Sequence, residues 1–142
     1  MIDSQELIQA CACARLRNAA RAMTRAYDDA LRPAGLTAAQ LATLAAIDVD
    51  HSPSIAQLSK RLGLDRTTLS RNLKPLENAS WIRLGDEGWR RSKTVHVTAE
   101  GRRRLARGAM LWESAQMRFL KRFGKSEWKR LETDLKIVAT VF

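Results

Sequence analysis

The sequence is poor in cysteine, proline and glycine. Its 142 residues include two Cys, three Pro and seven Gly. Two cysteines are too few for a small secreted scaffold held together by disulfides, and the scarcity of glycine and proline predicts few loops. No apolar run approaches the ~18 residues that a transmembrane helix requires. These absences favour one globular domain that has no membrane partner.

Motifs of enzymatic chemistry are also lacking. The sequence has no Gly-x-Ser-x-Gly nucleophile turn, no His-Glu-x-x-His zinc motif and no glycine-rich phosphate loop. Cys11 and Cys13 have no cluster of Cys or His around them in sequence that would complete a zinc site. We therefore expect no enzymatic activity, no cofactor and no metal. The first residues carry neither a basic leader nor an apolar run, so we expect a cytoplasmic location.

Positive charge dominates what is present. Lys and Arg number 25 against 15 Asp and Glu, which gives a net charge of +10. The excess is concentrated in residues 51–104, which hold twelve basic and five acidic residues, whereas residues 1–50 are close to neutral. Such a surface is typical of proteins that bind a polyanion, either nucleic acid or, less commonly, anionic lipid. The alternative is a basic face that is merely solvated.

Helix-capping signals and apolar periodicity predict six helices and one hairpin. A capping residue followed three positions later by Glu or Gln occurs at Asp3, Thr37 and Ser54, and Ser126 is the expected cap of the last helix. Apolar residues that recur every three or four positions predict the helices themselves. The expected helices cover residues 3–31, 37–47, 54–62, 66–79, 98–123 and 126–142, and the expected strands cover 81–84 and 93–98.

The third and fourth predicted helices form a helix-turn-helix pattern. A three-residue turn that starts with Gly63 separates them, and Asp65 can cap the fourth helix. One side of that helix is a leucine stripe. The other side carries only residues that can donate hydrogen bonds to phosphates and base edges, namely Arg66, Thr67, Ser70, Arg71 and Lys74. A plain surface helix normally mixes charges of both signs, so this face indicates DNA binding in a major groove.

The hairpin that follows has a basic loop. Residues 85–92 join the two predicted strands and include Arg90 and Arg91. A basic loop beside a helix-turn-helix is typical of the wing of a winged helix, which reaches a neighbouring minor groove or phosphate backbone. The alternative is an ordinary exposed hairpin.

The first and last predicted helices carry apolar faces that a compact winged helix cannot cover. On the last helix the apolar residues are spaced by three and four positions, as in a heptad repeat: Trp128, Leu131, Leu135, Val138 and Phe142. A second copy would cover these faces, and two copies are needed to read a palindromic site. We therefore expect a homodimer. The alternative is that the terminal helices pack only on one another within one chain.

In its order of elements and in five short strings, the sequence resembles the multiple-antibiotic-resistance regulator family, MarR. The strings are Arg21 to Tyr27, Pro33 to Thr37, Leu64 to Arg71, Leu76-Glu77 and Val95 to Gly101. The resemblance implies a mainly α fold with a small β-hairpin, in a single domain over residues 1–142. It places a winged helix-turn-helix at 36–98, a long connecting helix at 98–123 and dimerisation helices at 1–34 and 124–142.

The resemblance also implies a function and a set of contacts. It implies a homodimeric repressor that binds double-stranded DNA at a pseudo-palindromic operator and is released by a small aromatic or phenolic ligand. Where the family usually has an acidic residue before its wing arginines, this sequence has Trp89. The family's wing arginine corresponds to Arg90 or Arg91. Its recognition-helix contacts correspond to Arg66, Thr67, Thr68, Ser70, Arg71 and Lys74.

A ligand pocket is expected between the dimerisation helices and the winged helix. Arg15 or Arg17 could meet a carboxylate there, and the expected apolar lining is Met23, Tyr27 and Trp112. The alternative is that these arginines are solvent-exposed or paired with acids, and that the apolar residues belong to the core.

The two cysteines suggest a different way of regulating DNA binding. Cys13 aligns with the reactive cysteine of the family's organic-hydroperoxide sensors, but the tyrosines that hold their thiolate correspond here to Ala38 and Leu41. Cys11 and Cys13 are expected on one helix, pointing about 200° apart, which disfavours a disulfide between them. We expect buried, unreactive thiols. A thiol-based redox switch and a non-specific basic nucleic-acid-binding protein are the alternatives to a ligand-controlled repressor.

Overall fold

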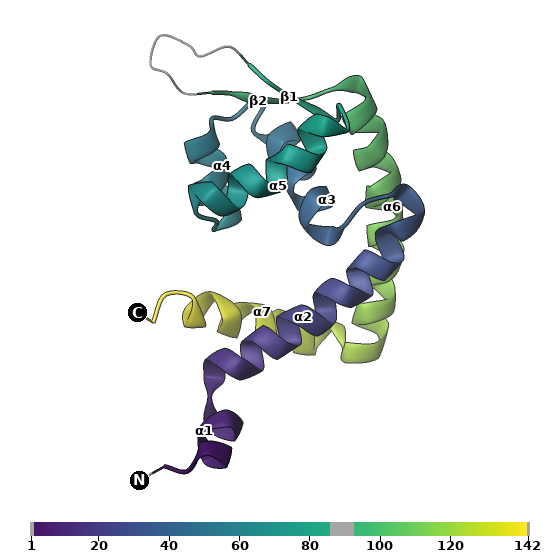
Figure 1. Cartoon of the computed structure of the whole chain (residues 1–142). Helices are drawn as coiled ribbons and strands as arrows, with labels where there is room; N and C mark the ends of the chain where they lie inside the picture. The colour runs from purple at the N-terminus through teal and green to yellow at the C-terminus, as the bar shows by residue number, and fades with distance from the viewer. Residues whose placement is uncertain (1, 86–92, 142) are drawn as a thin grey trace.

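The computed structural model describes residues 2–85 and 93–141 as a compact head joined by a long helix to a set of terminal helices (Figure 1). The head holds three helices and a two-stranded antiparallel hairpin: α3 (Ala38–Val49), α4 (Ile55–Leu62), α5 (Arg66–Asn78), β1 (Ile82–Leu84) and β2 (Val95–Val97). Outside the head lie α1 (Ser4–Ala10), α2 (Ala12–Leu31), the long helix α6 (Ala99–Phe123) and α7 (Lys125–Val138). A 3₁₀ turn, Arg32–Ala34, follows α2 directly and leads towards α3. None of the described helices is long and apolar enough to cross a membrane.

The predicted capping signals of the head are confirmed. Thr37 and Ser54 each accept a hydrogen bond from the backbone three residues on, and the glutamine there reaches back to the capping residue's N–H. Gly63 ends α4 with a φ of +64°, a left-handed conformation that glycine adopts without steric cost. These local interactions fix where α3 and α4 begin and where the turn before α5 is made.

The hydrophobic core lies inside the head. Each element of the head contributes apolar side chains that are almost fully buried, including Leu44, Leu58, Leu69, Ile82 and Val95. Burying one such side chain stabilises a fold by about 1.5–3 kcal/mol. Leu31, at the end of α2, also enters this core and attaches the first long helix to the head.

Three predicted helix limits are wrong. The helix predicted to reach residue 142 ends at Val138, and Phe142 of its predicted apolar stripe lies outside the described residues. The helix expected over 3–31 is interrupted at Cys11, whose ψ of 108° is extended. No residue of α1 is buried, so no packing against the described residues holds α1 in line with α2. The last helix begins at Lys125 rather than after Ser126, because Gly124 turns the chain at a φ of +104°. The Ser126 hydroxyl donates to the Glu127 carboxylate instead of capping the helix.

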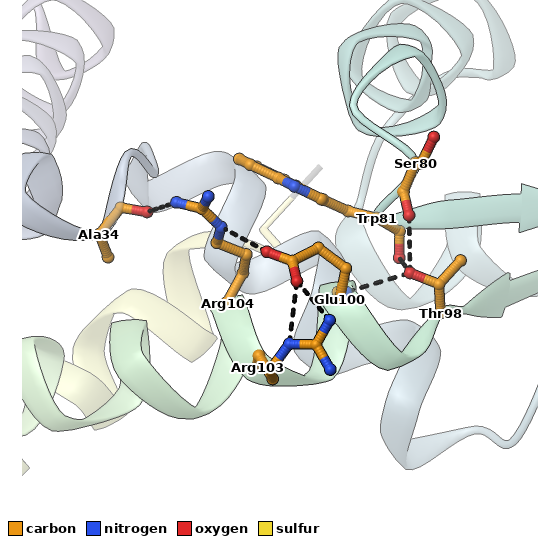
Figure 2. Close-up of polar contacts among 8 residues, drawn as sticks. Ala34, Ser80, Trp81, Thr98, Glu100, Arg103 and Arg104 are labelled. Atoms are coloured by element: carbon orange, nitrogen blue, oxygen red, sulfur yellow. Dashed lines mark hydrogen bonds and ion pairs between the residues drawn. The ribbon is translucent and has the colours of Figure 1, made fainter.

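Polar contacts fix the start of α6 against the end of α5 (Figure 2). Thr98 caps α6, and its hydroxyl also donates to the backbone oxygen of Ser80 at 2.7 Å. One turn into α6, a Cβ at Gly101 would lie 2.0 Å from the Trp81 carbonyl oxygen, so only glycine allows this close approach.

The same turn of α6 also contacts the link between α2 and α3. Arg104 donates through Nη1 to the Ala34 carbonyl oxygen at 3.0 Å and through Nε to Glu100 at 3.1 Å. Its guanidinium lies 5.2 Å from the ring centroid of Trp81, within the range of a cation–π contact. Arg104 therefore connects the hairpin end of the head to the segment that leads into the terminal helices.

Candidate nucleic-acid interface and neighbouring cavities

The helix α5 presents one buried and one exposed face, as its sequence predicts. Leu69, Leu73 and Leu76 are buried in the core. The side chains of the other face are exposed: Arg66, Thr67, Ser70, Arg71 and Lys74. The core therefore holds the helix by its leucines and leaves a continuous face of hydrogen-bond donors open to solvent.

The cations of this face have no acidic partner in the part of the chain that the structure describes. Among the described residues, no ion pair involves Arg66, Arg71 or Lys74. Other arginines of the head and of α6 do have acidic partners, as in the pair of Arg61 with Asp50. The guanidinium and ammonium groups of α5 therefore keep their donors available for phosphates or base edges.

Thr68 differs from the other predicted contact residues. It is half-buried, and its hydroxyl donates to the Asp65 carboxylate at 2.7 Å, while its backbone N–H donates to the same group at 2.8 Å. The hydrogen bond from the Thr68 backbone lowers the pKa of Asp65. Within the chain, Thr68 thus stabilises the start of α5 rather than extending its exposed face.

We expect Asp65→Ala to weaken DNA binding severalfold, because the first turn of α5 carries Arg66 and Thr67 and would lose its cap. Asp65→Asn is the matched control, since asparagine removes the charge but still accepts the Thr68 N–H. The lowered pKa implies that the carboxylate cap is complete above about pH 4 and is lost only as the pH falls through its folded-state value. Fluorescence anisotropy on a DNA duplex at neutral pH compares the variants. Equal losses in both would show that the charge, not the cap, is responsible.

The hairpin beside α5 is held to the start of α4. Ile82 pairs with Val97 and Leu84 with Val95. Thr94 also forms a β-bridge with Ser54, the residue that caps α4. The hairpin base is therefore fixed relative to the helix-turn-helix. The predicted wing contacts Arg90 and Arg91, and the neighbouring Trp89, lie outside the described residues.

Two cavities lie beside α6, one facing α2 and the other facing α2 and α3. The first has a volume of about 460 Å³ and includes Met23, Tyr27 and Phe119 in its lining. The second has a volume of about 330 Å³, is almost wholly apolar and includes Tyr27, Leu105 and Trp112. Of the predicted ligand-binding residues, Met23, Tyr27 and Trp112 are thus brought to these cavities. Tyr27 borders both, its hydroxyl donates to Gln116, and burial raises its pKa.

The predicted carboxylate partners are elsewhere. Arg15 donates through Nε to the Gln9 carbonyl oxygen at 2.8 Å, and Arg17 lies against Cys13, so neither lines the two cavities. Arg118 and Arg122 line the larger cavity instead. Arg118 and Arg122 are four residues apart, as are Ala115 and Phe119 of the same lining. This helical spacing could have indicated from the sequence that the four residues share one face of α6.

The cysteines are not buried within the chain, contrary to expectation. Cys13 is exposed and Cys11 is half-buried. They also do not share one helix, because Cys11 lies at the break between α1 and α2. Arg17 donates through Nη2 to the Cys13 Sγ at 3.3 Å. The argument that Cys11 and Cys13 point about 200° apart assumes that both lie on one helix. It therefore does not apply to this structure.

Comparisons with known proteins agree with this architecture. The sequence profile of the MarR family matches residues 34–92. The transcriptional regulator MosR of M. tuberculosis, solved in complex with DNA, is 36% identical, with 90% of this chain and 92% of that chain covered and a TM-score of 0.82. No curated protein sequence matches the chain.

Two further solved structures share the fold. A mutant MarR from E. coli complexed with operator DNA is 24% identical, with 93% of this chain and 96% of that chain covered and a TM-score of 0.81. The transcriptional repressor CouR, bound to p-coumaroyl-CoA, is 21% identical, with full coverage of both chains and a TM-score of 0.83.

Proposed function

The chain belongs to the MarR family of DNA-binding transcriptional regulators, and on that premise we propose that it is a homodimeric repressor. It reads a pseudo-palindromic operator through α5 and releases it when a small aromatic ligand binds beside α6. The observation that carries the proposal is the exposed face of α5 on a helix fixed by three buried leucines. Its cations form no ion pair with a described residue, and hydroxyl groups lie beside them. Such a face can contact both phosphates and base edges.

The uncovered apolar faces support a dimer. Neither α1 nor α7 has a buried residue, and several of their large apolar side chains are more than half exposed, including Leu7, Ile8 and Ile137. Met117 on the lower part of α6 is 61% exposed as well. A second copy related by a two-fold axis would cover these faces and present two α5 helices to one DNA duplex.

The cavities beside α6 support control by a ligand. The lining of the cavity between α2 and α6 combines apolar side chains with Arg118 and Arg122, which suits an aromatic molecule that carries a carboxylate. CouR, a repressor of the same fold, binds p-coumaroyl-CoA. A ligand wedged between α2 and α6 would change the spacing of the two α5 helices, since α6 is attached to both the head and the terminal helices.

The test is fluorescence anisotropy on the DNA upstream of the chain's own gene, against a scrambled duplex, across a salt series. Specific sites bind on the order of a thousandfold or more tighter than random DNA. If the protein binds the upstream and the scrambled duplex equally tightly, a duplex selected for binding from a random library replaces the upstream DNA. If selection also yields no preference, the protein is a non-specific nucleic-acid binder and the proposal is wrong. Phenolic carboxylates added to the specific complex then test release.

A redox switch is the second candidate, and the surroundings of Cys13 favour it. Its thiol is exposed at the second residue of α2, with the Arg17 guanidinium beside it, and cysteines at helix N-termini next to arginine are prone to oxidation. An organic hydroperoxide should then lower operator affinity in the wild type but not in Cys13→Ser. Cys11→Ser, with mass spectrometry, shows whether the second thiol forms a disulfide. An unchanged response in Cys13→Ser excludes the switch.

A further inference from the structure

The hairpin has an outer face that does not pack against the core of the head. Ile82, Val95 and Val97 are buried against the helices of the head. Side chains alternate along a strand, so Arg83 and His96, which pair directly across β1 and β2, point to the opposite face. The leucines of α5 belong to the buried side. The outer face therefore lies on the other side of the sheet from α5.

A polar cavity of about 520 Å³ lies over this outer face. Its walls come from four parts of the chain: the end of α3, the loop after it, the two strands and the first turn of α6. The charged and polar side chains that line it include Asp48, His51, Ser52, Arg83, His96 and Arg102. None of these residues belongs to the cavities beside α6.

The imidazole of His96 is held in place inside this cavity. Its Nδ1 shares a hydrogen bond with the Ser52 hydroxyl, and its Nε2 lies 3.0 Å from the Thr94 hydroxyl. A Cβ at Gly85 would lie only 2.8 Å from Nε2, so the ring is packed against the backbone there. Two hydroxyl neighbours and a close backbone leave the ring one position, which is the arrangement of a formed site rather than of a mobile surface side chain.

The loop that supplies Ser52 has an uncommon backbone. His51 has a φ of 49° and Ser52 a φ of 72°, both in the left-handed region that residues other than glycine rarely occupy. Such conformations persist only where their surroundings enforce them, and they gather at binding sites. Here the conformation directs the Ser52 hydroxyl to His96.

The cavity has more positive than negative charge. Asp48 is its one carboxylate among the lining residues, and it pairs with Arg102 at a long N···O distance of 3.6 Å. Arg102 also donates to the Val97 carbonyl oxygen at 3.2 Å, which leaves further guanidinium N–H groups for another partner. Arg83 forms no ion pair with any described residue. Two guanidinium groups therefore face this space, against one carboxylate.

We propose that this cavity is a binding site for the phosphate group of a small molecule. Guanidinium groups bind oxyanions through paired, charge-assisted hydrogen bonds, and a phosphate has enough acceptor oxygens for Arg83 and Arg102 together. Both ring nitrogens of His96 already face hydroxyl groups, so this side chain forms part of the wall of the site. The site is separate from the face of α5 and from the cavities beside α6. It adjoins the loop that ends at Ser54, where α4 begins. The occupant therefore contacts the segment that enters the helix-turn-helix.

Titration of the full-length protein with inorganic phosphate, in a buffer of constant ionic strength, tests the site. Calorimetry measures the affinity for phosphate, and the NMR resonances of the histidine rings show where the phosphate binds. We expect saturable binding that shifts the resonances of His96 and His51. Arg83→Gln should weaken binding about tenfold, as expected for loss of a charged hydrogen-bond donor. Arg83 is exposed, so its replacement leaves the core unchanged.

Arg107→Gln is the matched control, because Arg107 is exposed on α6, loses the same charge and does not line this cavity. It should leave phosphate affinity almost unchanged. Equal weakening in both variants, or binding without saturation, would mean that phosphate responds only to the net charge of the protein, and would overturn the proposal. So would an Arg83→Gln variant that loses DNA affinity while its phosphate titration is unchanged, because the face would then belong to the DNA interface.

Discussion

Glutamate in place of both Leu135 and Val138 is expected to leave the protein monomeric and to reduce its operator affinity by about a thousandfold or more. These side chains on α7 are 37% and 47% exposed, so within one chain they remain partly uncovered. Two buried charges in a dimer interface would lack partners and would oppose association. A monomer carries only one α5 helix and loses the second half-site. Sedimentation gives the oligomeric state, and anisotropy gives the affinity.

Thr133→Glu is the matched control for this double variant. Thr133 is exposed on the same helix, outside the predicted apolar stripe, and its hydroxyl bonds only to the Lys129 carbonyl oxygen within the helix. The control adds a charge to α7 and should remain dimeric with wild-type affinity. A double variant that stays dimeric, with circular dichroism showing intact helices, would locate the dimer interface elsewhere or show that the terminal helices pack only within the chain.

Arg71→Ala is expected to lower operator affinity by roughly ten- to a hundredfold and random-DNA affinity much less. Arg71 is exposed one turn into the donor face of α5 and has no ion pair with the described residues, so its guanidinium is available for a bidentate contact with a guanine edge. A contact of that kind discriminates against the wrong base by about 1–3 kcal/mol. Anisotropy on operator and scrambled duplexes measures both affinities.

Two comparisons make this result specific. Arg130→Ala removes the same charge from an exposed position on α7 and should change both affinities little. Arg90→Ala with Arg91→Ala should instead weaken binding to all duplexes and flatten the salt dependence, if the wing contacts only phosphates. If Arg71→Ala reduced the two affinities equally, Arg71 would be a phosphate contact and the base-reading residue would have to be sought among Arg66, Thr67 and Ser70.

The head of the molecule could be predicted in detail because its signals are local. The caps at Thr37, Ser54 and Asp65 each act within three residues, and Gly63 needs only its own backbone freedom. The leucine stripe of α5 follows from helical periodicity alone. These signals fix the helix-turn-helix and the exposed donor face before any tertiary contact is known.

Two features of the structure have no local signal in the sequence. A capping signal at Asp3 correctly predicted a helix start, but no local signal marked the break at Cys11. The sequence predicts Arg15 or Arg17 as the carboxylate partner of a ligand, and this stays a prediction, whereas the cavity between α2 and α6 has Arg118 and Arg122 beside Met23 and Tyr27. Which side chains share a cavity depends on how two helices cross, and periodicity within either helix does not contain that information.

The sequence by itself determined the helix-turn-helix, the charge of its exposed face and the membership of a family of DNA-binding regulators, because these depend on neighbours a few residues apart. Only the tertiary structure decided three other features. Arg104 joins α6 to Ala34 across 70 residues, Cys13 is exposed rather than buried, and His96 lies between Ser52 and Thr94 over a cationic cavity. The first and the third depend on segments brought together by burial of the core, and that packing is set by the whole chain at once. Cys13 is exposed because no described segment packs over its side chain.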